Sequence, residues 1–184
     1  MVEIELKAWV TDPEALHARL SRLGGSGGAY DKKDTYYRAP HASGAFEFRI
    51  RQTGDQVVFT RKEKRIDRGL EINQEDEFAV SDAEQLADLV MRLGCTVFAQ
   101  KRKRGHRFVV NGLTVELSEV AGLGWFVEIE ALVADISERP TVEARIRALL
   151  AELEIPEQLI EPAPYTAMIA DPAAARSRPD GVGR

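Results

Sequence analysis

Alternating apolar and polar side chains run through most of this chain and predict a protein built mainly of strands. At the N-terminus, Ile4 and Leu6 alternate with Glu3, Glu5 and Lys7. Successive side chains of a strand point to opposite faces, so the apolar residues share one face and the charged residues the other. The same pattern predicts strands over residues 2–10, 46–51, 57–64, 97–110, 113–120 and 125–133.

Helices are predicted between some of these strands. The run Thr11-Asp12-Pro13-Glu14 has a capping side chain, a proline for the first turn and an acid near the positive end of the helix dipole, and Gly24-Gly25 ends the helix. A glycine-rich link is expected from there through Gly28. A further helix is expected over residues 141–153, and a short terminal helix within residues 155–170.

The second half of the chain repeats features of the first at a constant offset of 70 residues. Val80-Ser81-Asp82 echoes Val10-Thr11-Asp12, and Arg92-Leu93-Gly94 echoes Arg22-Leu23-Gly24. Any strand followed by a helix that ends in Leu-Gly would share some of these features. We nevertheless expect an internal duplication.

Two predicted hairpins indicate which charges face one another. Asn111-Gly112 is a strong two-residue turn signal, and this turn pairs Arg107 with Glu116 and Gly105 with Ser118. In the same strand, alternation sends Lys101 and Lys103 to this charged face, whereas Arg102 and Arg104 are expected to face solvent. The other hairpin turns at Gly54-Asp55 and pairs Arg49 with Thr60 and Arg51 with Val58.

Like charges are grouped on the predicted charged faces. Alternating charges usually mark the solvated face of an antiparallel sheet, but such a face would be more stable with the two signs mixed. A closed barrel with these faces inward would offer carboxylates to a metal and cations to phosphates, a combination that suits a triphosphate. The acidic pairs are Glu3/Glu5, Glu75/Glu77 and Glu128/Glu130, and the basic pairs are Arg49/Arg51 and Lys101/Lys103.

Length, net charge and cysteine content limit which classes of protein this chain can belong to. The chain has 184 residues, which favours one domain over residues 1–170, followed by a flexible tail over residues 171–184. A net charge of −5 argues against a general nucleic-acid or membrane-surface binder. The single cysteine, Cys95, excludes an internal disulfide, and the chain has no apolar run of membrane-spanning length. We expect a cytoplasmic protein.

Several motifs in order resemble the CYTH superfamily, named for the bacterial class IV adenylate cyclase and thiamine triphosphatase. The resemblance runs from Glu3 to about Tyr165, which is nearly the whole ordered chain. It is carried by Glu3-x-Glu5-x-Lys7, Asp34-Thr35-Tyr36-Tyr37, Arg49-Ile50-Arg51, Thr60-Arg61-Lys62, Glu75-Asp76-Glu77, Lys101-Arg102-Lys103 and Gly122-Leu123-Gly124-Trp125-Phe126-Val127-Glu128-Ile129-Glu130.

The resemblance implies an α+β fold, a tunnel-shaped closed barrel of eight antiparallel strands with helices packed outside, that binds a triphosphate with Mg2+ or Mn2+. The implied metal ligands are Glu3, Glu5, Glu128 and Glu130, with Glu75 and Glu77 as further acids. The implied phosphate-binding residues are Lys7, Arg49, Arg51, Lys62, Lys101 and Lys103, of which Lys7, Lys62 and Arg51 are the catalytic candidates. Family members often carry an aspartate where this chain has Ser118, and Glu116 is the expected substitute ligand.

Three functions compete. The favoured function is a class IV-like cyclase that converts ATP to cyclic AMP and pyrophosphate. The alternatives are a triphosphatase acting on thiamine triphosphate, inorganic triphosphate or a nucleotide, and a non-catalytic polyphosphate- or nucleotide-binding module. The expected partner is the small-molecule triphosphate, with no nucleic acid and no membrane, and a homodimer is left open.

Overall fold

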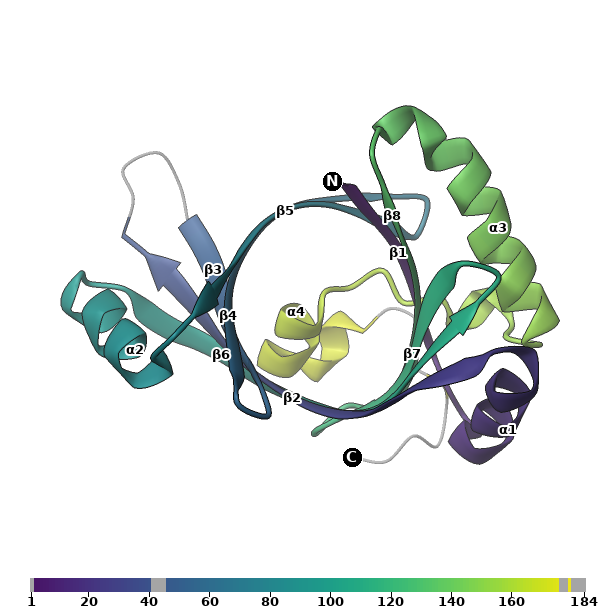
Figure 1. The fold of residues 1–184 in the computed structure, drawn as a ribbon, viewed down its shortest axis with the longest axis horizontal. Coiled ribbons are helices and arrows are strands. Elements are labelled where there is room, and N and C mark those ends of the chain that lie inside the picture. Colours follow the sequence, from purple (N-terminus) through teal and green to yellow (C-terminus); the bar gives the residue numbers. More distant parts are fainter. Residues whose placement is uncertain (1, 41–45, 176–178, 180–184) are drawn as a thin grey trace.

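A closed barrel of antiparallel strands forms the centre of the protein (Figure 1). The computed structural model describes residues 2–40, 46–175 and 179. The strands follow one another around the barrel in the order β1-β5-β4-β3-β2-β6-β7-β8, which confirms the predicted eight-stranded fold. Their bounds are β1 Val2–Trp9, β2 Gly25–Ala39, β3 Phe46–Thr53, β4 Gln56–Asp67, β5 Leu70–Val80, β6 Thr96–Val110, β7 Leu113–Val120 and β8 Gly124–Val133.

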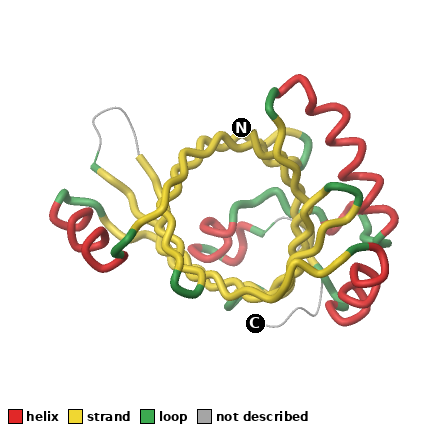
Figure 2. Tube along the Cα trace, viewed as in Figure 1, coloured by secondary structure: helices red, strands yellow, loops and turns green. Residues whose placement is uncertain are grey.

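Helices surround this barrel (Figure 2). Two of them, α1 and α3, lie on the side of β1, β7 and β8, and α2 lies on the opposite side against β3 and β4. The last helix, α4, lies across the opening of the barrel when the molecule is viewed as in Figure 1. The bounds are α1 Pro13–Leu23, α2 Ala83–Arg92, α3 Arg139–Glu152 and α4 Tyr165–Ala170, with short 3-10 turns at Ile136–Glu138, Glu157–Leu159 and Pro172–Ala174.

Both predicted hairpins have the expected register. Arg107 pairs with Glu116 and Gly105 with Ser118 across the β6–β7 hairpin. Asn111 and Gly112 have positive φ values of 52° and 72° in its turn, as a two-residue turn that matches the strand twist requires. Across the β3–β4 hairpin, the residue pairs again match the prediction from the turn at Gly54-Asp55.

The predicted glycine-rich link is wrong, because β2 already begins at Gly25 and pairs with β6 from there on. Gly24, the residue before β2, lies very close to β6. A Cβ atom on Gly24 would lie 2.3 Å from the carbonyl oxygen of Val109, so only glycine fits there. Gly28 has a φ of 97° next to a shift in the β2–β6 register. The glycines therefore allow close packing and a bulge within a strand.

Apolar clusters cover the outside of the barrel, and two of them pack against α1, α2 and α3. Ile4 and Leu6 of β1 pack with Leu20 of α1 and Ile146 of α3 in the larger cluster. The aromatic and aliphatic side chains of β2, β3 and β4 pack against α2 in another cluster, which includes the buried Cys95. Because strand neighbours alternate, burying these faces under helices turns the charged faces toward the interior of the barrel.

The order of strands is unchanged when β1–β4 and β5–β8 are exchanged. The two halves also start their helices alike, since Asp12 accepts a hydrogen bond from the Ala15 backbone N–H at 3.0 Å and Asp82 from that of Gln85 at 2.9 Å. This symmetry is what a duplicated strand–helix unit would produce. The duplication itself stays a prediction.

The segment before α4 is tied to β1. The Glu161 backbone N–H donates to the Lys7 carbonyl at 2.8 Å, and Trp9 Nε1 donates to Glu161 Oε2 at 3.2 Å. These bonds hold α4 over the barrel opening.

The single domain over residues 1–170 and the flexible tail stay predictions. Residues 172–174 form a 3-10 turn, and residues 176–178 and 180–184 lie outside the described residues. Of the helices described, none has the length and hydropathy needed to cross a membrane.

Candidate functional site

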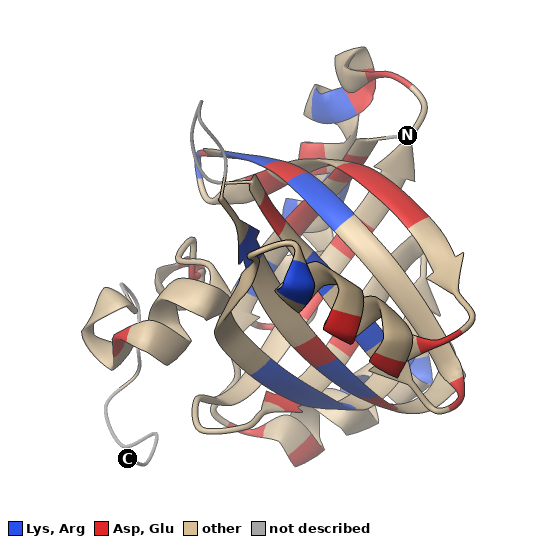
Figure 3. Cartoon of the chain, turned by 90° about the vertical axis from the view of Figure 1, so that its left-hand side faces the viewer, with Lys and Arg blue, Asp and Glu red and all other residues tan. Residues whose placement is uncertain are grey.

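The inside of the barrel is a charged cavity of about 540 Å³. Charged positions recur along the strands that enclose it (Figure 3). Every site residue predicted from the sequence lines this cavity: Glu3, Glu5, Lys7, Arg49, Arg51, Lys62, Glu75, Glu77, Lys101, Lys103, Glu116, Glu128 and Glu130. Arg102 and Arg104 are exposed, as alternation predicted.

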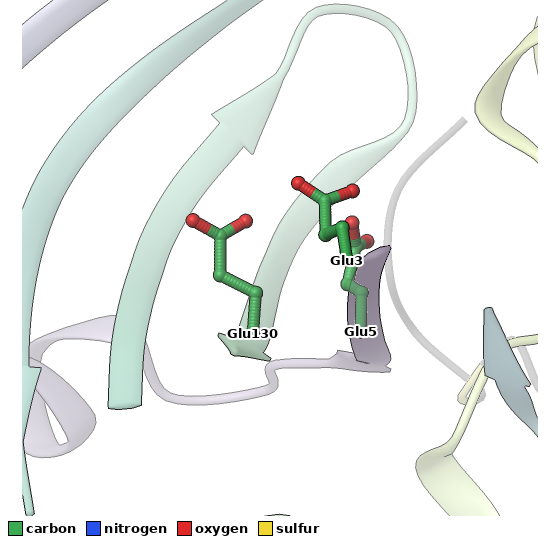
Figure 4. A group of neighbouring side chains, drawn as sticks. All are labelled: Glu3, Glu5 and Glu130. Carbon is green, nitrogen blue, oxygen red and sulfur yellow. The ribbon is translucent and has the colours of Figure 1, made fainter. Parts of the chain in front are cut away.

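Three carboxylates gather on one wall of the cavity. Glu3 and Glu5 project from β1 and Glu130 from β8, and one oxygen of each lies within 4.8 Å of the others (Figure 4). Strand pairing produces this crowding, since Glu5 lies opposite Glu130 on one side and opposite Glu71 on the other. We call Glu3, Glu5 and Glu130 the acidic cluster.

Electrostatics in the acidic cluster favour a cation. Burial, together with Glu71 and Glu3, raises the pKa of Glu5 to about 7. Burial and the neighbouring carboxylates raise the pKa of Glu130 to about 7 as well. Burial alone would also raise the pKa of Glu3, but Lys62, which donates to it at 2.9 Å, outweighs that effect and lowers the pKa. Within the described residues, Glu5 and Glu130 take part in no ion pair, and nearby lysines only partly offset the effect of burial on their pKa.

This donor set fits a divalent metal ion. Mg2+ and Mn2+ prefer oxygen ligands, and carboxylates without a cation partner are available to bind them. Glu128, the fourth predicted ligand, instead contacts Lys103. Glu75 contacts Lys62, and Glu77 accepts a hydrogen bond from Thr60 Oγ1 at 3.1 Å. Within the described residues, the structure therefore brings Glu3, Glu5 and Glu130 together as one group of possible ligands, and Lys62 joins Glu75 to Glu3 at its edge.

A second part of the cavity wall gathers cations around Asp34 of β2. The carboxylate, buried completely, accepts two hydrogen bonds from Arg51 at 2.7 and 2.9 Å. Lys101 Nζ lies 3.1 Å from it and Arg49 3.8 Å. Burial alone would raise the pKa of Asp34, but Lys101 and Arg51 outweigh it and hold this pKa far below its usual range. We call this arrangement the Asp34 node.

Glu116 of β7 forms a similar node. Its carboxylate contacts Lys32 at 2.6 Å, Lys103 at 2.8 Å and Arg107 at 2.8 Å. Burial works against ionisation of Glu116, but Lys103 and Lys32 outweigh burial and keep its pKa far below the usual range. We call it the Glu116 node. With both oxygens occupied by cations, Glu116 is placed as a counter-ion for lysines.

Lys7 lies between the acidic cluster and the segment before α4. Its ammonium donates to the Ala163 carbonyl at 2.5 Å and lies 4.1 Å from the centre of the Tyr165 ring. Burial lowers the pKa of Lys7 to about 8.

Ser118 does not line the cavity. It is fully buried opposite Gly105, where a Cβ atom would lie 2.0 Å from the Leu117 carbonyl oxygen. The strands β6 and β7 therefore approach each other closely at this pair, where only small residues fit.

Sequence reasoning missed several cavity residues. Lys32 and Tyr36 line the cavity beside Asp34 on β2, and Glu71 lines it on β5. Alternation of Tyr30, Lys32, Asp34 and Tyr36 was the available signal, but this strand follows glycines that suggested a link. Phe98 carries no such signal, because it lies at a strand irregularity that the sequence does not reveal.

A family model and a curated relative both match most of this chain. Residues 1–165 match the family model of the CYTH domain. A curated protein of Methanocaldococcus jannaschii, named a putative adenylate cyclase, is 25% identical over 162 residues, covering 84% of this chain and 91% of that protein.

Solved structures show the same architecture. A conserved hypothetical protein from Pyrococcus furiosus is 27% identical with a TM-score of 0.79, over 91% of this chain and 99% of that chain. A Hippeastrum protein, described as a putative adenylyl cyclase with a dominant triphosphatase activity, has a TM-score of 0.62 over 91% of this chain and 95% of its own. Its 19% identity shows a shared fold alone.

Proposed function

The chain belongs to the CYTH domain family, whose members act on small-molecule triphosphates, and we propose that it is a metal-dependent enzyme that converts ATP to cyclic AMP and pyrophosphate. The name of the Methanocaldococcus jannaschii relative, a putative adenylate cyclase, agrees with this choice.

One observation carries the proposal: the acidic cluster shares a closed barrel with the cations of the Asp34 and Glu116 nodes. A phosphate-binding module alone would gain little from three crowded carboxylates, because they repel the anion it has to bind. Acids and cations in one cavity instead suit a triphosphate that arrives with a divalent metal ion.

In this mechanism Glu3, Glu5 and Glu130 would hold Mg2+ or Mn2+, and the bound ion would offset negative charge on the phosphate oxygens. Arg49, Arg51 and Lys101 bind the phosphates from the opposite side, and Asp34 keeps their charged groups oriented before the substrate arrives. Lys7 and Lys62, which border the acidic cluster, complete the phosphate-binding set.

The reaction transfers the α-phosphorus from one oxygen to another. The ribose 3′-oxygen forms a bond to the α-phosphorus, the bond from that phosphorus to the oxygen bridging to the β-phosphate breaks, and pyrophosphate leaves with the negative charge. The hydroxyl proton passes to solvent or to a base. Arg51 and Lys62 stabilise the charge that develops on the phosphates, as preorganised donors do.

The test is an assay of purified protein with ATP and Mg2+ or Mn2+ that resolves cyclic AMP, pyrophosphate, ADP and free phosphate. Cyclic AMP with an equal amount of pyrophosphate supports the proposal. ADP with free phosphate indicates a triphosphatase instead, and binding without turnover indicates a binding module. A Glu5→Gln variant prepared in parallel controls for contaminating enzymes, since it should form product at least about 100-fold more slowly.

A further inference from the structure

A β-bulge interrupts β6 at Phe98. Tyr36 of β2 pairs with Ala99, whereas the next residue, Tyr37, pairs with Val97, so Phe98 is the extra residue between them. Tyr37 packs in the cluster under α2, and Val97 is 44% exposed on the same outer side. The bulge thereby lets Phe98 line the cavity next to Ala99, although strict alternation would place it on the outer face.

Other flat side chains lie beside Phe98. The Tyr36 ring is 6.1 Å away, tilted by 55°, and the Arg38 guanidinium is 4.6 Å from the centre of the Phe98 ring. Arg38 is itself fixed by two hydrogen bonds to Glu47, at 3.0 and 2.7 Å. Phe98 and Tyr36 both line the cavity, and we call these two rings the aromatic wall.

The aromatic wall adjoins the phosphate-binding cations. The Tyr36 hydroxyl lies 3.3 Å from Asp34, and Lys101 Nζ lies 5.8 Å from the centre of the Tyr36 ring. Lys101 also lies 4.8 Å from the ring of Tyr165, the first residue of α4, which borders the cavity. A phosphate chain held at the Asp34 node would therefore have aromatic side chains within reach of its substituent.

We propose that Phe98 and Tyr36 bind the planar ring of the group attached to the phosphate chain, so that the cavity prefers nucleoside-type triphosphates to inorganic triphosphate. This inference rests on the proposed function, since it assumes that the cations bind the phosphates. Its physical basis is stacking, which contributes binding free energy with any flat ring and gains further from a neighbouring guanidinium. Inorganic triphosphate offers no such ring.

Binding measurements on two ligands test the inference. Calorimetric titration in Mg2+ compares inorganic triphosphate with a non-reactive ATP analogue on the wild type, on Phe98→Ala and on Val97→Ala. Phe98→Ala should weaken binding of the ATP analogue about 10-fold, as loss of one stacked aromatic does, and leave inorganic triphosphate unchanged. Val97→Ala removes a neighbouring apolar side chain on the outer face and should change neither affinity.

A Phe98→Trp variant distinguishes a loss of ring stacking from a loss of folded protein. This variant keeps a flat ring and should retain tight binding of the ATP analogue, with the same unfolding temperature as the wild type. If Phe98→Ala weakens both ligands equally, or neither, the aromatic wall does not select the substrate. If the wild type binds neither ligand, the proposed function itself is wrong, and this outcome differs from every outcome that concerns Phe98 alone.

Discussion

The two charged regions of the cavity differ in how their carboxylates are neutralised. Asp34 and Glu116 each lie among three cations. These cations hold the pKa of both carboxylates far below its usual range. Glu5 and Glu130, by contrast, take part in no ion pair within the described residues, and burial beside other acids raises their pKa to about 7. A neutralised acid orients cations, whereas an acid without a partner is available to an incoming cation. The difference therefore separates counter-ions from the proposed metal ligands, although both sets are glutamates or aspartates on inward faces.

The largest expected effect comes from removing charge at the Glu116 node. Glu116→Gln would leave Lys32 buried without its counter-charge and Lys103 with Glu128 alone, which should destabilise the fold by about 3–5 kcal/mol. Urea unfolding measures this loss. Mn2+ titration of the folded variant is the matched measurement: a large loss of metal affinity with little loss of stability would make Glu116 a ligand and erase the contrast between the two regions.

The acidic cluster should respond in the opposite way. Glu5→Gln should lower activity by about 100-fold or more and weaken metal binding, because it removes a ligand. Stability of the metal-free protein should stay the same or rise, since repulsion from Glu71 and Glu130 is relieved. Glu63→Gln is the matched control, because Glu63 pairs with Arg61 and has an exposed side chain. Full activity of Glu5→Gln, or full activity of the wild type in excess EDTA, would exclude the metal assignment.

Cations inside and outside the barrel should also differ. Arg51→Ala should cost about 2–4 kcal/mol of transition-state stabilisation, as loss of a preorganised donor does. Arg102→Ala should cost less than about 0.5 kcal/mol, because Arg102 pairs with Asp31 on the exposed outer face. Steady-state kinetics on the two variants give both values. Equal losses would mean that the inner and outer faces of the barrel are not functionally distinct.

The last prediction concerns how the stability of the metal-free protein depends on pH. Glu5 and Glu130 have a raised pKa in the folded, metal-free protein, so their contribution to stability is present below their ordinary pKa and is lost as pH rises through about 7. The loss should be on the order of 2 kcal/mol for each carboxylate between pH 5 and pH 8. Thermal unfolding in EDTA at the two pH values measures it, and Glu5→Gln should show a smaller difference. A wild-type protein equally stable at both values would show that the cluster is already neutralised.

Much of this arrangement could be predicted from local sequence. Asn111-Gly112 determines the β6–β7 register, and alternation then assigns Arg107 and Glu116 to the inner face. What could not be predicted is which acid meets which cation on strands that are far apart in the chain. Glu116 meets Lys32 only because β2 and β7 both flank β6 in the closed barrel, 84 residues apart in the chain.

Irregular backbone limited the prediction as well. The bulge at Phe98 shifts the alternation of β6 by one residue, and no turn residue or glycine marks it. The glycines before Tyr30 resemble a loop signal, yet they allow two strands to approach closely. In both places, tertiary contacts decide a conformation that propensity alone leaves open.

The position of β1 has a consequence for how the protein folds. Among the described strands, β1 pairs with β5 and β8, and its residue Val2 lies opposite Val133. Closing the barrel therefore requires contacts between residues 131 positions apart, and contacts so distant in sequence slow folding. Glu3 and Glu5 meet Glu130 only at this step. A metal ion that binds all three carboxylates would bind only the closed barrel. It would therefore shift the equilibrium from the open sheet to the closed barrel.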